Sequence, residues 1–272
     1  MAENRIDSLF AELRAGGRKA LMPFVTAGDP DVGTTVRLLE AAQEAGASVC
    51  EVGIPFSDPI ADGPVIQASM ARALDAGLKV SDVFAAVAEA RPRLSLGLVA
   101  MVSYSIVHRL GLDAFVGQAA DAGFDGLIFP DLPLAASGPA RAAADAHGLT
   151  LSLLIAPTTP IARAEQIAAA CRGFVYVVSR PGITGASSAL PEELPRRLER
   201  LRGVTDLPLA VGFGVSTAEQ VRSVVSVADA AIVGSALVER VHRYSGGEDA
   251  VGHARSFIAE LATGLPVGSA AA

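Results

Sequence analysis

The sequence predicts an α/β fold and, within that class, a (β/α)8 barrel, the TIM barrel. Eight short apolar runs recur along the chain, and a segment with helical character follows each of them. A glycine at the end of a helical segment precedes several of these runs, and Gly123, Gly148 and Gly173 are evenly spaced. Eight such units in 272 residues match the strand number and the length of this fold. The same pattern also allows a doubly wound parallel sheet.

The runs expected to form strands are nearly all apolar, as is typical of parallel strands covered on both faces. They lie at residues 20–28, 48–55, 96–102, 126–131, 150–156, 174–179, 208–214 and 230–237. Segments such as 31–46 and 216–227 are expected to form the helices between them, closed by glycines in the left-handed conformation. We further expect an extra N-terminal helix at about 3–15 and extra short helices in the loops. The barrel at about 20–265 then makes the whole chain, 1–272, one domain.

Composition narrows the function classes. With 51% hydrophobic and 19% charged residues, the chain is typical of a globular protein. The net charge of −7 argues against nucleic acid or an anionic membrane as the main partner, because both attract basic surfaces. The N-terminal segment 1–17 carries acids and has no apolar core of the kind found in signal peptides. We therefore expect a cytoplasmic protein.

Cysteine and histidine residues give no sign of a metal or nucleophile site. Cys50 and Cys171 make neither a disulfide framework nor a metal cluster, so both are expected to be core thiols. No histidine falls at the C-terminal end of an expected strand, so all are expected at the surface or in packing roles. The histidines are His108, His147, His242 and His253.

The run SVCEVGIP at 48–55 carries a carboxylate in its middle. Side chains alternate along a strand, so Val49, Glu51 and Gly53 share one face. The opposite face consists of Cys50, Val52 and Ile54. This bulky apolar set suits the layer under the helices, which leaves Glu51 inside the barrel near the C-terminal mouth, where active sites of this fold lie. Glu51 is thus a candidate catalytic group; a structural carboxylate in an ion pair is the alternative.

Two further acids follow in the loop SDPIADGP. Asp58 and Asp62 lie in Asp-Pro and Asp-Gly dipeptides, which are ordinary in turns. Pro64 is suited to the first position of a helix, so Asp62 alone would be read as a turn or capping residue.

Glycines near the end of the chain indicate a phosphate site. The runs at 208–214 and 230–237 end in GFG and GS, and a helix is expected to open at Gly234–Ser235. Backbone N–H groups in these loops and a helix N-terminus form the usual phosphate site of this fold. Turn formation alone is the alternative. The long segment RPGITGASSALPEEL at 180–194 is a candidate lid over the barrel mouth, or else a plain surface connection.

Five motifs in order resemble the α subunit family of tryptophan synthase: PFVTAGDP at 23–30, EVGIPFSDPIADGP at 51–64, SRPGITGA at 179–186, GFGVST at 212–217 and VGSALV at 233–238. The likeness extends from about residue 5 to residue 260. It implies a carbon–carbon lyase of tryptophan biosynthesis that splits indole-3-glycerol phosphate into indole and glyceraldehyde 3-phosphate. It also implies no cofactor and no metal, and a PLP-dependent β subunit as partner in an α2β2 heterotetramer.

The resemblance carries roles onto individual residues. Glu51 and Asp62 match the catalytic glutamate and aspartate, and Tyr176 matches a tyrosine close to the glutamate. Thr184 in the candidate lid matches a threonine that bonds the aspartate on closure. The expected phosphate-binding residues are Gly185, Gly214, Gly234 and Ser235, and the expected walls of the indole pocket are Phe24, Phe213 and Ile155.

The chemistry fits two carboxyl groups in different surroundings. Burial is expected to raise the pKa of Glu51, whereas Asp62 on a wetter loop is expected to stay ionised. One departure concerns the stretch MVSYSIV at 101–107, where Ser105 stands in place of the family's asparagine on the partner side. Phe56, Pro59, Pro130 and Pro133 are expected to contribute to the docking surface. A phosphosugar isomerase or epimerase, an inactive docking subunit and a free-standing lyase remain as alternatives.

Overall fold

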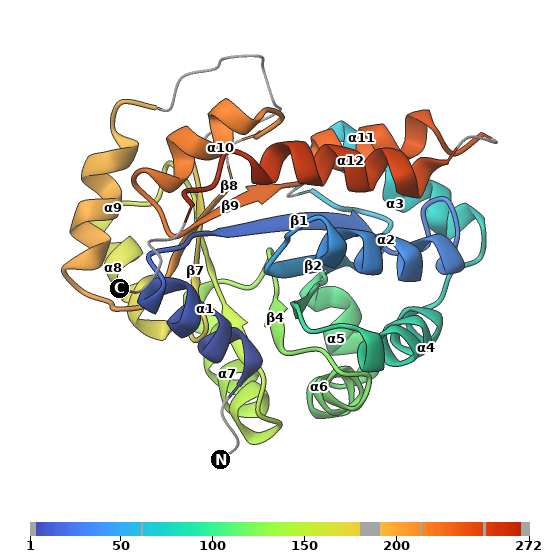
Figure 1. Cartoon of the computed structure of the whole chain (residues 1–272). Helices are drawn as coiled ribbons and strands as arrows, with labels where there is room; N and C mark the ends of the chain where they lie inside the picture. Colours follow the sequence, from blue (N-terminus) through green and yellow to red (C-terminus); the bar gives the residue numbers. More distant parts are fainter. Residues whose placement is uncertain (1–3, 61, 180–190, 213, 247–248, 268–272) are drawn as a thin grey trace.

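The computed structural model describes residues 4–60, 62–179, 191–212, 214–246 and 249–267. Its strands are all parallel and are, in chain order, β1 (Ala20–Thr26), β2 (Val49–Gly53), β3 (Gly97–Met101), β4 (Gly126–Ile128), β5 (Thr150–Ser152), β6 (Leu154–Ile155), β7 (Val175–Val178), β8 (Leu209–Gly212) and β9 (Ala230–Val233). The order in the sheet is β5-β4-β3-β2-β1-β9-β8-β7-β6. Only Leu153 separates β5 from β6, so these two edges are one interrupted strand and the sheet closes into a barrel (Figure 1).

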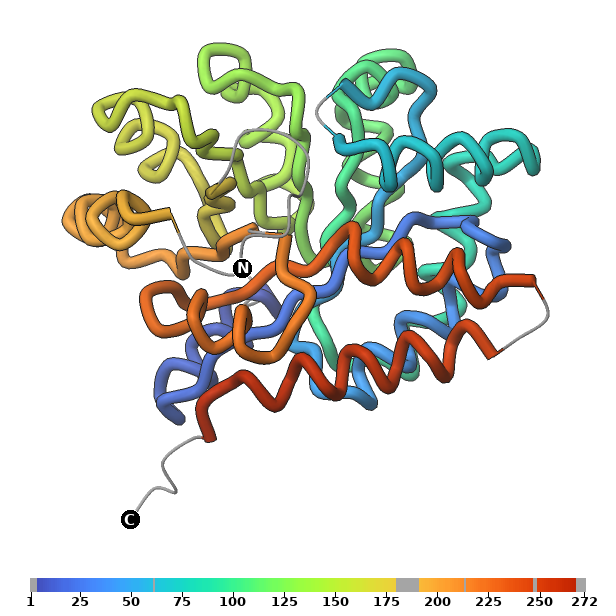
Figure 2. Tube along the Cα trace, turned by 90° about the horizontal axis from the view of Figure 1, so that it is seen from above, coloured from blue at the N-terminus to red at the C-terminus, as the bar shows by residue number. Residues whose placement is uncertain are grey.

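Helices lie around the outside of this barrel, as Figure 2 shows in a view turned by 90° from that of Figure 1. The helices of the described ranges are α1 (Arg5–Ala15), α2 (Val32–Glu44), α3 (Pro64–Asp75), α4 (Val80–Ala90), α5 (Tyr104–Leu110), α6 (Leu112–Asp121), α7 (Ser137–Ala146), α8 (Ile161–Ala170), α9 (Leu194–Arg202), α10 (Ala218–Val225), α11 (Ser235–Arg243) and α12 (Ala250–Ala262), with 3-10 turns η1 (Arg91–Arg93) and η2 (Leu134–Ala136). The barrel prediction is confirmed, including the N-terminal helix and the short extra helices. No described helix has the length and apolar character that crossing a membrane requires.

The glycines that precede the strands end helices as expected. Gly46, Gly123, Gly148 and Gly173 all have positive φ, between 73° and 94°. Most residues avoid this conformation because their Cβ atom is crowded there, whereas glycine adopts it at little cost. These glycines let each helix turn back into the next strand within a few residues.

The register of the strands fixes the heights of the side chains inside the barrel. Followed through β9, β8 and β7, the pairing leads from Ala20 to Leu154. Followed through β2, β3 and β4, it leads from Phe24 to Thr150. Phe24 lies four residues after Ala20 and Thr150 four residues before Leu154, so the two paths differ by eight residues. This is the shear of a TIM barrel, in which alternate strands share a layer of interior side chains.

Four interior layers follow from this register. From the C-terminal mouth downward they are Phe24, Met101, Leu154 and Gly212; then Glu51, Ile128, Tyr176 and Ile232; then Met22, Val99, Ser152 and Ala210; and then Val49, Gly126, Phe174 and Ala230. Their bulky apolar members belong to one interior cluster. The outward set Cys50, Val52 and Ile54 lies instead in the cluster between barrel and helices. The predicted division of β2 into an inner and an outer face is therefore confirmed.

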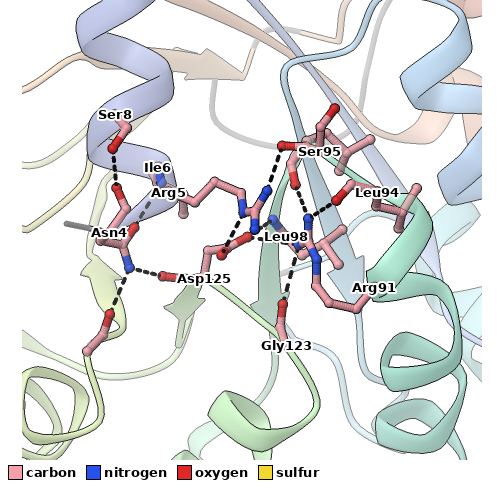
Figure 3. Close-up of polar contacts among 12 residues, drawn as sticks. Asn4, Arg5, Ile6, Ser8, Arg91, Leu94, Ser95, Leu98, Gly123 and Asp125 are labelled. Carbon is pink, nitrogen blue, oxygen red and sulfur yellow. Dashed lines mark hydrogen bonds and ion pairs between the residues drawn. The ribbon is translucent and has the colours of Figure 1, made fainter. Parts of the chain in front are cut away.

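Helix α1 closes the N-terminal end of the barrel. Its residues Ile6 and Phe10 are buried in the interior cluster, and the rings of Phe10 and Phe174 lie 6.1 Å apart. Asn4 caps the helix by accepting a hydrogen bond from the N–H of Ile6 at 2.9 Å. The same Asn4 amide donates to the carbonyls of Asp125 and Gly148, both at 2.8 Å (Figure 3). The helix is thus fastened to the loops that enter β4 and β5.

Asp125 connects this plug to the neighbouring strands. Its carboxylate accepts from the N–H of Leu98 at 2.8 Å and from Arg91 at 3.1 Å, and it lies 3.4 Å from the Arg5 guanidinium (Figure 3). Arg91 also donates to the carbonyls of Leu94 and Leu96. Only 14% of the Asp125 side chain is exposed, so these charge-assisted bonds are largely shielded from water.

Replacing Asp125 tests this junction. We expect Asp125→Ala to lower the free energy of unfolding by roughly 2–3 kcal/mol, because it leaves the buried Leu98 N–H without an acceptor and the Arg91 guanidinium without a carboxylate to balance its charge. Asp125→Asn keeps the size and one acceptor, and should lose less. Urea unfolding measures both, with Asp121→Ala on the exposed surface of α6 as the control. An Asp125→Ala variant as stable as that control would show that the junction contributes little.

Candidate active site

Glu51 is a carboxyl group buried in the barrel interior. Its residue is 0% exposed, and both carboxyl oxygens are buried without a hydrogen-bond partner among the described residues. Burial raises the pKa of Glu51 to about 8, because the charged form has lost its water. At neutral pH the group therefore holds a proton, as expected from the sequence. The structural alternative, a carboxylate held in an ion pair, finds no support among the described residues.

Glycine at position 53 makes room for the aromatic ring beside Glu51. Phe24 pairs with Glu51 in the register and is almost fully buried. A Cβ atom at Gly53 would lie 2.6 Å from the Cε2 atom of Phe24, which is too close for two carbon atoms. Phe24 thus occupies the mouth layer directly above Glu51, and its role in the wall of the indole pocket stays a prediction.

Asp62 lies in the loop between β2 and α3. Its N–H donates to the carbonyl of Pro59 at 3.0 Å, and its carbonyl accepts from the Gln67 side chain at 2.8 Å. The N-cap of α3 is Gly63, with no side-chain cap, and Pro64 opens the helix. The capping interpretation of Asp62 is therefore wrong, and the side chain is left for another role.

Burial also raises the pKa of Asp62, to about 6. Asp62 is half-buried, so it is less exposed to water than the sequence analysis predicts. The value nevertheless stays below that of Glu51, so at neutral pH Asp62 is mostly ionised while Glu51 is mostly protonated. The pKa values of the two carboxyl groups therefore differ in the predicted direction, with that of Glu51 the higher.

Tyr176 shares the interior layer of Glu51. Burial raises the pKa of Tyr176 well above 10, and the charges of Glu51 and Asp62 raise it further. The phenol therefore stays protonated and is a hydrogen-bond donor at every pH of interest. Gly212 leaves room for it, since a Cβ atom at that position would lie 3.3 Å from the Tyr176 Oη atom. The structure thus brings together the three residues predicted to be catalytic.

A cavity of about 270 Å³ opens at the mouth beside Asp62. Met70 and Met101 line it, and both also belong to the interior cluster. The other side of the cavity is formed by the loops after β2, β3 and β4, including Ile60, Ser103 and Pro130. The cavity therefore connects the barrel interior with the outer rim.

Two long-range contacts fasten α3, and with it the Asp62 loop, to the end of β1. The hydroxyls of Thr26 and Ser69 share a buried hydrogen bond of 2.6 Å. Arg72 donates to both oxygens of Asp29, at 2.9 Å and 2.6 Å. Sequence reasoning missed these four residues, because their partners lie 43 positions apart and nothing local indicates the pairing.

The expected phosphate site is described in part. Helix α11 begins at Ser235 with Gly234 as its N-cap and without a side-chain cap, so its first N–H groups remain available to an anion. Gly214 is exposed and has φ of 72°. Three further predicted residues, Thr184, Gly185 and Phe213, lie outside the described residues, and so does most of the candidate lid at 180–194.

Ile155 does not lie where the sequence prediction placed it. It is fully buried in the outer cluster, between barrel and helices. Its neighbour Leu154 pairs with Tyr176 and packs against the interior cluster in the mouth layer. Alternation along the strand gives only one of the two an inward direction, so the apolar wall contributed by this strand is Leu154.

Ser105, which stands where the family has asparagine, lies next to a group of hydrogen bonds between two loops. The Ser103 hydroxyl donates to Asp131 at 2.7 Å, and the N–H of Tyr104 donates to the same carboxylate at 2.8 Å. Ser103 also caps α5 by accepting from the N–H of Ser105. The loops after β3 and β4 are therefore joined through Asp131.

The histidines and cysteines lie outside the interior layers of the barrel and do not line the cavity beside Asp62. His108, His147 and His242 are exposed and His253 is half-buried on α12, all away from the strand ends. Cys50 is fully buried on the outer face of β2, and Cys171 is half-buried at the end of α8.

Comparison with known proteins gives a consistent result. The family model described as "Tryptophan synthase alpha chain" matches residues 10–265. Among the curated relatives, the tryptophan synthase alpha chain of Chloroflexus aurantiacus is 47% identical over 259 residues, covering 95% of this chain and 97% of the relative. That of a Thermoanaerobacter species is 41% identical over 258 residues, covering 95% of this chain and 98% of the relative.

Comparison with solved structures gives the same family as the sequence comparison. Tryptophan synthase of Mycobacterium tuberculosis superposes with a TM-score of 0.88 at 36% identity, over 97% of this chain and 99% of that chain. The tryptophan synthase alpha subunit of Legionella pneumophila gives 0.88 at 34% identity, over 97% of this chain and 98% of that chain. With the two carboxyl groups, the tyrosine and the open helix end in place, this chain belongs to the tryptophan synthase alpha chain family.

Proposed function

We propose that this chain cleaves indole-3-glycerol phosphate by a retro-aldol reaction, with Glu51 and Asp62 as its acid–base pair. The observation that carries the proposal is the Glu51 carboxyl group, fully buried, without a partner among the described residues and protonated at neutral pH. A structural acid would be paired, whereas a group that must exchange protons with a substrate is left free. Family membership favours this function over a phosphosugar isomerase or epimerase.

Each carboxyl group has a defined task in this reaction. Glu51 donates its proton to C3 of the indole ring, which breaks the aromaticity of the five-membered ring and leaves a cationic indolenine. The Asp62 carboxylate holds the ring N–H proton and balances the positive charge. Glu51, now ionised, accepts the proton of the C3′ hydroxyl. The C3–C3′ bond then breaks, its electrons restore the indole ring, and the C3′ carbon becomes the aldehyde of glyceraldehyde 3-phosphate.

The remaining site residues bind and orient the substrate in this proposal. The N–H groups at Gly234 and Ser235, with Gly214 and Gly185, hold the phosphate. Phe24, Phe213 and Leu154 enclose the indole ring, and Thr184 acts on Asp62 as the lid closes. Every step is a proton transfer between side chains and substrate, and we propose no metal or organic cofactor.

We also propose a PLP-dependent β subunit as the partner, in an α2β2 assembly in the cytoplasm. Indole is small and uncharged, so direct transfer to a second active site prevents its loss from the cell. The mouth presents apolar groups for docking: Ile60 is 89% exposed, Pro133 is exposed, and Phe56, Pro59 and Pro130 are half-buried. These residues follow β2 and β4 on the same side as the cavity beside Asp62.

Glu51→Gln tests the central residue. We expect the variant to bind substrate but to release indole at least 10² times more slowly, because an amide cannot exchange the proton. Its fold has a separate readout. In the wild type, the carboxyl ionises near 4.5 when unfolded and near 8 when folded, so its stability contribution is lost as pH rises through that window. Glu51→Gln should therefore gain stability relative to wild type from pH 5 to pH 9. Indole release within ten-fold of wild type would remove Glu51 from its role; Glu89→Gln, an exposed acid, is the control.

The two pKa values predict a bell-shaped pH profile for kcat/KM. Activity requires Glu51 protonated and Asp62 ionised, so kcat/KM should fall above about pH 8 and below about pH 6. Asp62→Asn should be at least 10² times slower and should lack the acidic limb. Steady-state indole assays from pH 5 to pH 9.5 measure both profiles. A wild-type profile that is flat across this range contradicts the assignment of the pair.

Adding a β subunit tests the partner. We expect the isolated chain to be a monomer with slow cleavage, and the mixture to show an α2β2 species with a rate at least ten-fold higher. Sedimentation and indole release, measured with and without a β subunit from a related bacterium, provide the data. Pro133→Asp, at an exposed residue outside the cavity wall, should weaken assembly without changing the slow rate of the isolated chain. If neither a heavier species nor a faster rate is seen, the chain is an autonomous lyase.

A further inference from the structure

Ser152 is a second buried polar group inside the barrel that has no explained role. The residue is 1% exposed, and its Oγ atom is buried without a hydrogen-bond partner among the described residues. Buried hydroxyls are nearly always bonded to protein or to ordered water, because an unpaired one costs free energy. The two Glu51 oxygens are unpaired in the same way. One shared hydrogen-bond partner would satisfy both the Ser152 hydroxyl and the Glu51 carboxyl group.

The register places Ser152 in the layer directly beneath Glu51. Ile128, a member of the Glu51 layer, is the residue paired with Ser152. The other members of the Ser152 layer, Met22, Val99 and Ala210, have no strong hydrogen-bonding group. The layer below, which holds Val49, Gly126, Phe174 and Ala230, has none either. Thr150 lies further down on the same strand, and its hydroxyl already donates to the carbonyl of Asp125 at 3.4 Å. The nearest polar side chains without a partner among the described residues are therefore those of the layer above, where Glu51 lies.

The size of the side chains indicates that the connection is indirect. Ser152 is short, and β3 and β4 separate its strand from β2, so its hydroxyl and the Glu51 carboxyl group enter the interior from different sides of the barrel. Ala210 in the same layer is also small, which limits how far this layer fills the space below Glu51. Two unpaired polar groups in adjacent layers suit one bridging water molecule, which needs at least two polar partners.

We propose that Ser152 holds one interior water molecule, and that this water hydrogen-bonds to the Glu51 carboxyl group and positions it. The proposal rests on the proposed function, in which Glu51 donates a proton and later takes one back. Water both donates and accepts. It accepts from Glu51 when the acid is protonated, and donates to it when the carboxylate has formed. Ser152 is therefore a positioning residue that serves both states of the catalytic group.

Ser152→Ala tests the proposal. We expect kcat to fall about ten-fold with KM changed less than about two-fold, the effect of one lost hydrogen bond in the reacting state. The basic limb of the pH profile should move upward by about one unit, because the charged form of Glu51 loses a donor. Asp62 and Tyr176 are the other titratable groups that face Glu51, and Cys50 faces the outer layer. Since Tyr176 titrates well above 10, a limb near 8 reports Glu51.

Two further variants separate positioning from packing. Val99→Ala removes volume from the same layer but no hydroxyl, so it should lower stability and leave the basic limb in place. Ser152→Cys keeps the size but is a weak donor, so it should lie between wild type and Ser152→Ala, and it decides the matter if Ser152→Ala does not fold. A crystal structure of the wild type should show a water within hydrogen-bond distance of the Ser152 Oγ and a Glu51 oxygen.

The outcomes are distinguishable from failure of the proposed function. If Glu51→Gln retains activity, the proposed function fails whatever Ser152 does. If Glu51→Gln is inactive but the folded Ser152 variants match wild type in kcat and basic limb, only the water proposal is overturned. Equal effects of Ser152→Ala and Val99→Ala on the pH profile would likewise assign Ser152 to packing alone.

Discussion

The structure depends on one constraint: a carboxyl group must stay buried inside the barrel without an ion-pair partner. Glu51 retains its proton at neutral pH only while bulk water is kept from it and no cation neutralises it. The barrel meets this condition with apolar layers around the acid and with glycines where rings must pass. Gly53 admits the Phe24 ring and Gly212 admits Tyr176. A side chain at either glycine would displace the ring that shields the acid, so these small residues are part of the electrostatic environment.

Sealing the other end of the barrel serves the same condition. A barrel open at its N-terminal end would admit water to the lower layers and so reach Glu51 from below. Helix α1 prevents this by placing Ile6 and Phe10 in the interior cluster. Its attachment is polar, through Asn4 and Asp125, because a helix end and two strand entries bring unpaired backbone groups together there. The contacts that hold α1 in place therefore also help to keep the pKa of Glu51 raised.

The alternation of side chains along each strand explains why the inward direction predicted for Glu51 is confirmed and why the place predicted for Ile155 is wrong. In the run at 48–55, the bulky apolar residues alternate with Glu51, and the rule placed the acid inside. The same rule applied to 150–156 puts the apolar residues Leu151, Leu153 and Ile155 outside, and leaves Ser152 and Leu154 inside. Ile155 was assigned instead from resemblance, and the register shows the neighbour in its place. The burial of Asp62 was beyond sequence reasoning, because the helix that follows it is fixed by contacts of Ser69 and Arg72 with residues 43 positions away.

The positions of the two acids also decide where a partner is able to act. Glu51 lies in the middle of a strand bonded on both sides, so a docking event cannot move its backbone without breaking the barrel. Asp62 lies in a loop whose far end is fixed by α3 but whose near end adjoins the exposed Ile60. The loops after β3 and β4 come next around the rim and are joined by Asp131, so a displacement of one loop moves the other. A β subunit docked on this rim would therefore regulate cleavage through the position and pKa of Asp62, while the acid below it stays constant.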